Sequence, residues 1–428
     1  MAHIIKNYDS LATSESRKLV LSLVEAAFAA IEPRKVMGKH FRLEGDSLHI
    51  MDQQFNLAQF ERIFLIGFGK GSAGIVKIVE DTLGERLTAG FDIDVVDDSF
   101  DFAKVHYTKG THPLPTQANI DYTKSVLEAT ANLTEKDLVL VVVCGGGSVL
   151  FEAPQSVDLQ KLGEVNNALL KSGATISEMN VIRKHLSRVK GGSLAKHLYP
   201  ATVASLIFSD VPGNDLSVIA SAPTVKDPTT LNTVHEVLRK YHLTDHVALS
   251  DSDFTESATD DKYFANVHNL MILSNQTALQ AMQKAASTQG IEAIIQTDRL
   301  QGNALTIGQE LLAQAQTGKV ILYGGETTME VTGTGKGGRN QALVLATVPR
   351  ITDDTIIASF DSDGWDFYGL AGAIGDRTTA EKAVHLALDI PALLDNDDAY
   401  SFFQATGDGI DTGKLESNVS DLIIIYRP

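Results

Sequence analysis

Short apolar runs that alternate with helical patterns constrain the fold of this chain more than any other feature. One run, residues 138–143, is apolar at every position, as expected of a parallel strand covered by helices on both faces. Similar runs recur along the sequence and are separated by amphipathic stretches such as residues 75–83 and 303–314. This alternation predicts an α/β protein built on parallel strands.

The length of the chain predicts two domains. Its 428 residues exceed the size of about 250–300 residues at which a single hydrophobic core stops growing. A polar, acidic stretch without a clear period, residues 241–269, separates the two halves. We expect an N-terminal domain over residues 1–250, a connecting segment over 251–317 that is free to pack with the C-terminal half, and a C-terminal α/β domain over 318–428. We expect a cleft between the two domains.

The acidic composition disfavours several classes of partner. A net charge of −18, from 36 basic and 54 acidic residues, repels nucleic acid and anionic membrane surfaces. The one cysteine, Cys144, excludes an internal disulfide and a cysteine-based zinc site. Residues 19–31 are mostly apolar, but Glu25 interrupts them and their helical stripe predicts a surface helix rather than an export signal. We expect a soluble, cytoplasmic protein that binds small molecules; homo-oligomerisation stays open.

Glycine and lysine gather where the first buried strand ends. Residues 62–66 run into Gly67-Phe-Gly-Lys-Gly-Ser-Ala-Gly74, and a helical pattern follows. Glycines let the backbone approach a ligand, and a helix N-terminus offers free amides to an anion. We therefore predict a phosphate or carboxylate site formed by Gly69, Lys70, Gly71 and Ser72. The alternative is a tight turn with a solvated lysine.

The same turn also matches the dinucleotide fingerprint, Gly69-x-Gly71-x-x-Gly74. The acidic strand at residues 92–97 could supply the carboxylate that binds ribose in such proteins. A nicotinamide-dependent reductase is therefore one candidate function for this chain. The Walker A pattern is absent, because no Gly-Lys pair is followed by Ser or Thr. A kinase with this sequence is not a P-loop enzyme.

Two further segments of the first half carry candidate anion ligands. Three glycines follow the buried strand 138–143, and such a turn can form a nest of amides around phosphate, with Gly145, Gly146, Gly147 and Ser148. Ser148 could instead cap the next helix. Five basic side chains lie within residues 183–190, so we predict that at least one of Arg183, Lys184 and Lys190 faces an anion. The alternative is a solvated basic face.

Charged residues also follow the later strands. Asp210 follows strand 203–208, a position suited to general-base work or to Mg²⁺. In the second half, strand 320–323 leads to Glu326, and a loop rich in glycine opens a helix. We predict that this loop binds phosphate through Gly337, Gly338, Arg339 and Asn340. Asp363, after strand 356–360, is a second candidate for Mg²⁺.

Together these motifs resemble those of the type 2 glycerate kinases. The resemblance runs from about residue 16 to residue 422. It is carried by Asn180-Val-Ile-Arg-Lys-His-Leu-Ser187, Lys190-Gly-Gly, Ser209-Asp-Val-Pro-Gly213, Ala222-Pro-Thr, Gly325-Glu-Thr-Thr and Gly337-Gly-Arg-Asn-Gln341. It implies an N-terminal Rossmann-like domain joined to a smaller C-terminal MOFRL domain. It also implies transfer of the γ-phosphoryl group of ATP to the 2-hydroxyl of D-glycerate, with a divalent metal such as Mg²⁺, at an active site in the cleft between the two domains.

By motif, the resemblance implies that Lys70, Asp210 and Arg339 are the catalytic residues. These are the three positions that the residue chemistry selects independently. Several loops depart from the family pattern, including Ser362-Asp-Gly-Trp365 and Thr412-Gly-Lys-Leu-Glu-Ser-Asn418. These departures leave the hydroxy-acid acceptor undetermined. The sequence also does not determine the phosphorylated carbon, the metal preference or the oligomeric state. Two alternatives remain: an NAD(P)-dependent hydroxypyruvate reductase, and a non-catalytic sensor of an organic acid or sugar phosphate.

Overall fold

The computed structural model describes residues 3–97 and 100–428, and these form two compact units. The parallel-sheet unit comprises Met37–Ser209 and Asp215–Ile272. The mixed-sheet unit comprises the residues up to Val36, the short segment Asp210–Asn214, and Leu273–Pro428. Both units combine helices with a six-stranded sheet, so the α/β prediction is confirmed.

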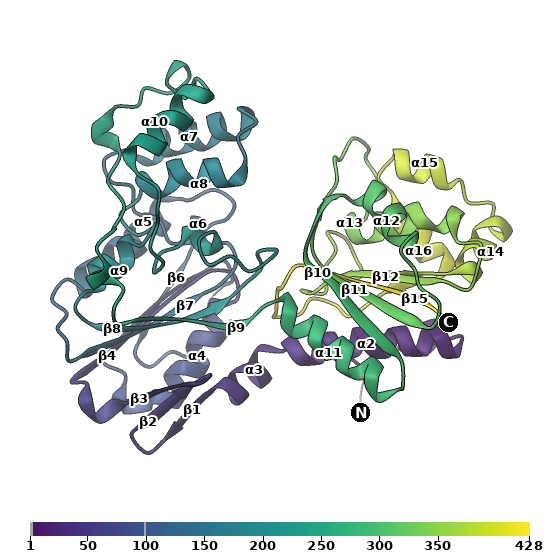
Figure 1. Ribbon diagram of the computed structural model, residues 1–428, viewed down its shortest axis with the longest axis horizontal. Helices are drawn as coiled ribbons and strands as arrows, with labels where there is room; N and C mark the ends of the chain where they lie inside the picture. Colours follow the sequence, from purple (N-terminus) through teal and green to yellow (C-terminus); the bar gives the residue numbers. More distant parts are fainter. Residues whose placement is uncertain (1–2, 98–99) are drawn as a thin grey trace. The chain divides into compact units, whose positions relative to one another are not determined.

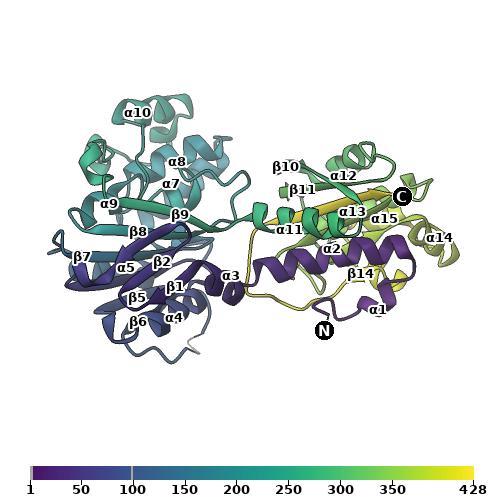
Figure 2. The same ribbon diagram turned by 60° about the horizontal axis from the view of Figure 1, so that its bottom comes forward.

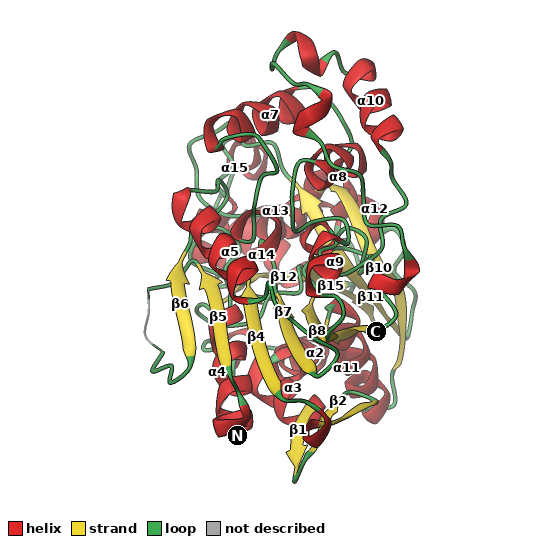
Figure 3. Cartoon of the chain, turned by 90° about the vertical axis from the view of Figure 1, so that its left-hand side faces the viewer, coloured by secondary structure: helices red, strands yellow, loops and turns green. Residues whose placement is uncertain are grey.

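The parallel-sheet unit is built on strands in the order β6-β5-β4-β7-β8-β9, of which β6, β5, β4, β7 and β8 are seen side by side in Figure 3. Their bounds are β4 Arg62–Phe68, β5 Ala89–Asp94, β6 Val105–Lys109, β7 Asp137–Val143, β8 Thr202–Phe208 and β9 Val267–Leu273. The pairs from β6 to β8 are parallel. All seven residues of β7 are buried, which explains its apolar sequence. The carboxyl ends of these strands therefore share one edge of the sheet.

Helices and a small sheet complete this unit (Figure 1). The helices are α4 Ser72–Leu83, α5 Gln117–Ala129, α6 Gly147–Leu150, α7 Leu159–Lys171, α8 Ile176–His185, α9 Ser193–Leu198 and α10 Leu231–Lys240. Helix α3, Pro33–His40, contains the division between the two units, which falls after Val36. The small antiparallel sheet contains β1 Phe41–Glu44, β2 Ser47–Ile50 and β3 Gln53–Asn56. Helices α7, α8 and α10 share a hydrophobic cluster of their own.

The mixed-sheet unit has the strand order β10-β11-β15-β12-β13-β14. The bounds are β10 Glu292–Asn303, β11 Lys319–Thr328, β12 Ile356–Asp361, β13 Gly372–Gly375, β14 Gly409–Ile410 and β15 Asp421–Arg427. Strands β10 and β11 are parallel, whereas β15 runs antiparallel to both of its neighbours, β11 and β12. The last strand of the chain therefore lies in the interior of the sheet, and its first residue reaches the same edge as the end of β12.

Helices cover both faces of the mixed sheet (Figure 2). On one face lie α2 Glu15–Ile31 and α11 Asn275–Thr288, which pack against each other. The other helices are α1 Tyr8–Leu11, α12 Ala304–Leu312, α13 Arg339–Thr347, α14 Arg377–His385, α15 Ile390–Asp395 and α16 Ala399–Thr406. Helix α2 is the surface helix expected around residues 19–31, and the Ser14 side chain caps its N-terminus.

The first residues of the chain belong with its C-terminal half. Arg17 on α2 is fully buried, and its guanidinium binds Asp376 and Asp408 of the mixed-sheet unit. The expected connecting segment contributes α11, β10 and α12 to the same unit. Within the described residues, no helix is both long and apolar enough to span a membrane.

Candidate active site

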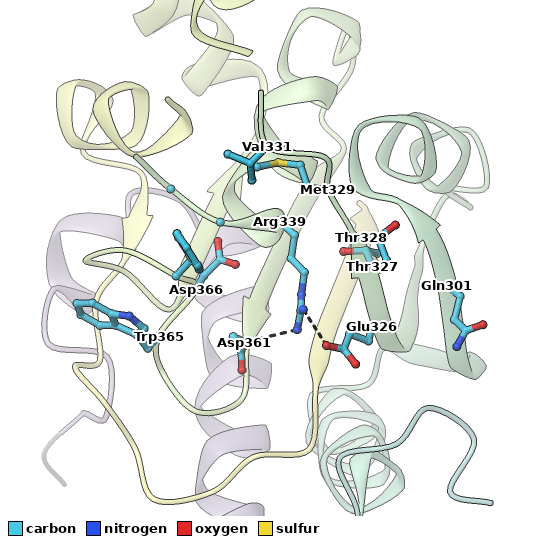
Figure 4. Close-up of a pocket in the computed structure, with 13 residues that line it drawn as sticks. Gln301, Glu326, Thr327, Thr328, Met329, Val331, Arg339, Asp361, Trp365 and Asp366 are labelled. Atoms are coloured by element: carbon cyan, nitrogen blue, oxygen red, sulfur yellow. Dashed lines mark hydrogen bonds and ion pairs between the residues drawn. The ribbon is translucent and has the colours of Figure 1, made fainter. Parts of the chain in front are cut away.

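A cavity of about 890 Å³ lies in the mixed-sheet unit (Figure 4). Its floor contains the ends of strands β11 and β12 and the start of helix α13. It is lined by Gln301, Glu326, Thr327, Thr328, Met329, Val331, Gly337, Gly338, Arg339, Asp361, Trp365, Asp366 and Phe367. Four residues of the predicted phosphate site, Glu326, Gly337, Gly338 and Arg339, therefore line one cavity.

Three carboxylates hold the Arg339 guanidinium in this cavity. Its Nε donates to Asp421 at 2.8 Å and its Nη1 donates to Glu326 at 2.8 Å, while its Nη2 lies 3.6 Å from Asp361. Burial opposes the charge on Arg339, but the carboxylates, Asp421 foremost, outweigh burial and raise its pKa. The guanidinium is therefore permanently charged and fixed in place.

The carboxylates outnumber the single cation at this site. Burial and the charges of Asp421 and Asp363 raise the pKa of Asp361 well above its ordinary value. Asp363 itself accepts a hydrogen bond from the Trp365 amide at 2.8 Å, which stabilises the turn after β12. The local excess of acidic groups favours an additional cation at the cavity floor.

The predicted ligand Asn340 is committed to internal contacts. Its side chain is fully buried, and its Nδ2 donates to Asp421 at 2.7 Å and to Asp366 at 3.2 Å. The two carboxylates of Asp366 and Asp421 therefore anchor the start of α13. Through Asp421, which both residues bind, the Asn340 side chain supports the position of Arg339.

Asp210 belongs to the same unit as Arg339. The backbone carbonyl of Asp210 accepts a hydrogen bond from the Ser420 hydroxyl, and Ser420 immediately precedes Asp421. Gly213, in the same short segment, donates its amide to the Asp298 carbonyl at 3.0 Å. The segment Asp210–Asn214 is therefore hydrogen-bonded to the residue that precedes β15, the strand whose Asp421 binds Arg339.

Lys70 lies in the parallel-sheet unit, where the first two glycine turns meet. Its backbone amide donates to the Gly145 carbonyl at 2.8 Å. An ideal Cβ on Gly146 would lie 3.4 Å from Lys70 Cε and 3.1 Å from His112 Cδ2, so both side chains pass over this glycine. Burial, followed by the charge of Lys70, lowers the pKa of His112. Across residues 3–97 and 100–428, no carboxylate forms an ion pair with the Lys70 ammonium group.

Sequence similarity to known proteins covers most of the chain. A profile described as a domain of unknown function, DUF4147, matches residues 19–252, and the MOFRL family profile matches residues 319–421. A glycerate 2-kinase of Pyrococcus horikoshii is 32% identical, over 95% of this chain and 96% of that protein. The chain belongs to the MOFRL-containing glycerate kinase family. A protein of Agrobacterium vitis is also 32% identical, over 84% of this chain and 98% of its own length. It carries the provisional name of a hydroxypyruvate reductase.

The fold agrees with this membership of the glycerate kinase family. The crystal structure of a glycerate kinase from Thermotoga maritima matches with a TM-score of 0.83 at 30% identity. The match covers 96% of this chain and 99% of that one. The chain therefore has the two-domain α/β architecture that its resemblance to the family predicted.

The basic stretch after α7 is mostly occupied by internal partners. Lys184 Nζ lies 3.2 Å from Asp227, Lys190 pairs with Glu152, and both lysines are buried. Burial lowers the pKa of Lys190 although Glu152 opposes this shift. Arg183 donates its Nε to Asn166 at 3.0 Å and is the most exposed of the three. Of the three predicted basic ligands, Arg183 is the one whose side chain is only half-buried and bonds to a neutral group.

Ser148 contacts a backbone turn with unusual geometry. Its hydroxyl lies 2.8 Å from the Ser221 hydroxyl. Ala220, Ser221 and Ala222 all have positive φ, at 49°, 59° and 60°. Three consecutive left-handed residues other than glycine are strained, and such strain gathers at functional sites. The turn also fixes the Lys190-Gly-Gly192 motif, because Gly191 and Gly192 donate their amides to the carbonyls of Ser221 and Ala222.

The sequence did not single out the carboxylates that organise these sites. Asp421 opens the last strand and binds both Arg339 and Asn340, but nothing in the local pattern distinguishes it. Asp94 and Asp366 contact the predicted phosphate turns directly. Both residues lie at or after the end of a strand, where a ligand-binding side chain is expected. That position alone predicted a ribose ligand as readily as a metal ligand.

Proposed function

We propose that this protein transfers the γ-phosphoryl group of ATP to glycerate and forms 2-phosphoglycerate from D-glycerate. Its relation to a glycerate 2-kinase over almost the whole of both chains carries the proposal. The geometry agrees, because a fixed guanidinium lines a cavity whose 890 Å³ falls within the range of small-molecule sites.

Phosphoryl transfer depends mainly on positioning and on electrostatic stabilisation, and the proposed residues supply both. Arg339 neutralises charge that develops on the transferred group. Lys70, with the turn Gly145–Gly147 and Ser148, binds the acceptor carboxylate and the ATP phosphates. Asp210 orients or deprotonates the attacking hydroxyl. Arg183 is a further anion ligand.

Mg²⁺ fits the acidic floor of the Arg339 cavity. The described residues contain no group of three His, Cys, Asp or Glu side chains placed to hold a metal. Mg²⁺ on ATP needs only one or two carboxylates, because water and phosphate oxygens complete its shell. We propose Asp361 as one ligand from the cavity floor, with either Asp210 or Asp363 as a second. The ion would neutralise charge on the phosphates of ATP.

The remaining expectations form part of the same proposal. The protein acts in the cytoplasm on small molecules and has no nucleic-acid or membrane partner. Its net charge of −18 supports this, since an acidic surface is repelled by phosphate backbones and anionic lipid. A homo-oligomer is compatible with all of these roles.

The deciding experiment measures ATP consumption across three- and four-carbon hydroxy-acids and locates the new phosphate by phosphorus NMR. We expect D-glycerate as the best acceptor and 2-phosphoglycerate as the product. Arg339→Ala should lower turnover by about 10³-fold or more without unfolding the protein. Arg377→Ala is the matched control, because Arg377 lies on the exposed surface of α14, where it pairs with Glu381. Near-normal turnover of Arg339→Ala would refute the role of Arg339.

The two alternatives make different predictions. A reductase of hydroxypyruvate would bind NADH tightly in a fluorescence titration and would ignore ATP. A dinucleotide pyrophosphate would need the first amides of α4, but the Asp94 carboxylate already accepts hydrogen bonds from Gly71 and Ala73. A non-catalytic sensor would show ligand-induced shifts in melting temperature without any ATP turnover.

A further inference from the structure

The first glycine turn already holds an anion of its own. The Asp94 carboxylate, at the end of β5, accepts the Gly71 amide at 2.9 Å and the Ala73 amide at 3.3 Å through the same oxygen. Asp94 is almost fully buried. The Lys70 amide donates to Gly145 and the Ser72 amide donates to Gly69, so every amide from Lys70 to Ala73 has a partner within the protein. No backbone amide from Lys70 to Ala73 is therefore left for a phosphate, whereas the Lys70 ammonium group is.

The glycine loop before α13 has the same construction. Asp366, which is buried, accepts the Asn340 amide at 3.1 Å and the Gln341 amide at 2.8 Å. An ideal Cβ on Gly338 would lie 2.3 Å from Asp366 Oδ1. Glycine is therefore required at 338 because the backbone passes close to an internal carboxylate, and a ligand is not needed to explain it.

The two turns place their cations in the same way. In each turn, the first amide that the carboxylate holds belongs to the residue directly after the cation: Gly71 follows Lys70, and Asn340 follows Arg339. Neither carboxylate lies on the helix that it caps, because Asp94 ends a strand and Asp366 follows one. Each carboxylate therefore ties the backbone of a cationic residue to the neighbouring sheet.

We propose that Asp94 and Asp366 are positioning residues that fix Lys70 and Arg339, and that substrate phosphates meet these cationic side chains and not the amides of α4 and α13. The inference rests on the proposed function, because it assigns Lys70 and Arg339 to catalysis. A helix N-terminus stabilises one negative charge most strongly within its first turn. Here a protein carboxylate takes that place, so the cation beside it stays available for the substrate.

Kinetics of single and double variants test the positioning role. Asp94→Asn and Asp366→Asn should each lower kcat about 10- to 100-fold, because displacement of a catalytic group by about 1 Å costs that much. The double variants Lys70→Ala/Asp94→Asn and Arg339→Ala/Asp366→Asn should be no slower than Lys70→Ala and Arg339→Ala alone. Losses that multiply in the double variants would overturn the proposal, since independent sites add in free energy.

The matched control is Asp97→Asn, the same substitution three residues after Asp94. Asp97 is exposed and forms a surface ion pair with Lys109, so its variant should keep wild-type kinetics. Circular dichroism and thermal melting check that every variant is folded. If the Asp94→Asn variant has wild-type kinetics, the positioning role is wrong.

A second measurement needs neither a variant nor enzymatic activity. In protein labelled with ¹⁵N-glycine, the Gly71 amide resonance should keep its shift when inorganic phosphate or ATP is added. A specific, saturable movement of Gly71 in the wild-type protein would overturn the proposal even if every variant failed to fold. If the wild-type protein does not phosphorylate glycerate, the proposed function fails, whereas the Gly71 resonance still decides whether the turn binds phosphate.

Discussion

Replacing Arg17 by methionine should strongly destabilise the mixed-sheet unit. Arg17 is fully buried on α2, and its guanidinium makes four hydrogen bonds to this unit. Two go to Asp376 at 2.6 and 2.9 Å, one to Asp408 at 2.7 Å and one to Thr379 at 2.9 Å. Methionine fills a similar volume but leaves Asp376 buried without its cation, whereas Asp408 keeps only its contact with Lys382 at 2.9 Å.

The expected loss is about 3–5 kcal/mol, the usual cost of removing one partner of a buried ion pair. For a unit of about 200 residues, each kcal/mol lowers the melting temperature by about 2–4 °C, so the shift should be about 10 °C. The dependence of stability on pH below about pH 4 should also change. Burial would raise the pKa of Asp376, but Arg17 outweighs burial and lowers it from 3.8 to about 2. The wild-type protein should therefore lose this contribution as the pH falls from about 4 to about 2.

Differential scanning calorimetry at pH 7 and at pH 3 measures both effects. Lys18→Met is the matched control on the same helix, since Lys18 pairs with Glu15 in solvent, and its melting temperature should not change. Arg17→Met should melt about 10 °C below the wild-type protein at pH 7, and the gap should narrow at pH 3. A shift no larger than that of Lys18→Met would refute the argument that α2 is anchored through this buried network.

Four further predictions follow from other sites. Ala222 has φ 60° and ψ 56°, so Ala222→Gly should raise the free energy of unfolding by about 0.5–1 kcal/mol in urea titrations, and a decrease would contradict the strain argument. Burial raises the pKa of Asp92 to about 8, so the wild-type protein should lose stability as the pH rises from about 4 to 8 because the unfolded chain releases this proton first. Asp92→Asn should remove that slope in thermal melts, and an unchanged slope would assign it to another group. Gly338→Ala should lower ATP turnover at least about ten-fold in a soluble protein, because its Cβ would push away the carboxylate behind the turn; full activity would show that the turn can relax. A fragment of residues 273–428 without the first 36 residues should lack a cooperative melt by circular dichroism, and a cooperative melt would show that Arg17 is dispensable.

The sequence by itself determined the elements and the chemistry near them. Fully apolar runs indicated buried strands such as β7, and a helical stripe after Ser14 indicated α2. Such patterns can be recognised within a short stretch of sequence, because side chains repeat their direction every two residues in a strand and every 3.6 residues in a helix. Short motifs likewise sufficed to select Lys70, Asp210 and Arg339 and to place the chain in its family, because each motif lies on one turn.

Only the tertiary structure decided which groups hold those turns. Arg17 and Asp376 are separated by 359 residues, and Arg339 and Asp421 by 82, so no local period links them. The antiparallel insertion of β15 between β11 and β12 brings Asp421 under Arg339, whereas the local sequence of β15 reads like any buried strand. The glycine turns looked like open anion sites for the same reason. A sequence shows that amides are close to a helix start. It does not show that a carboxylate at or after the end of another strand already accepts their hydrogen bonds.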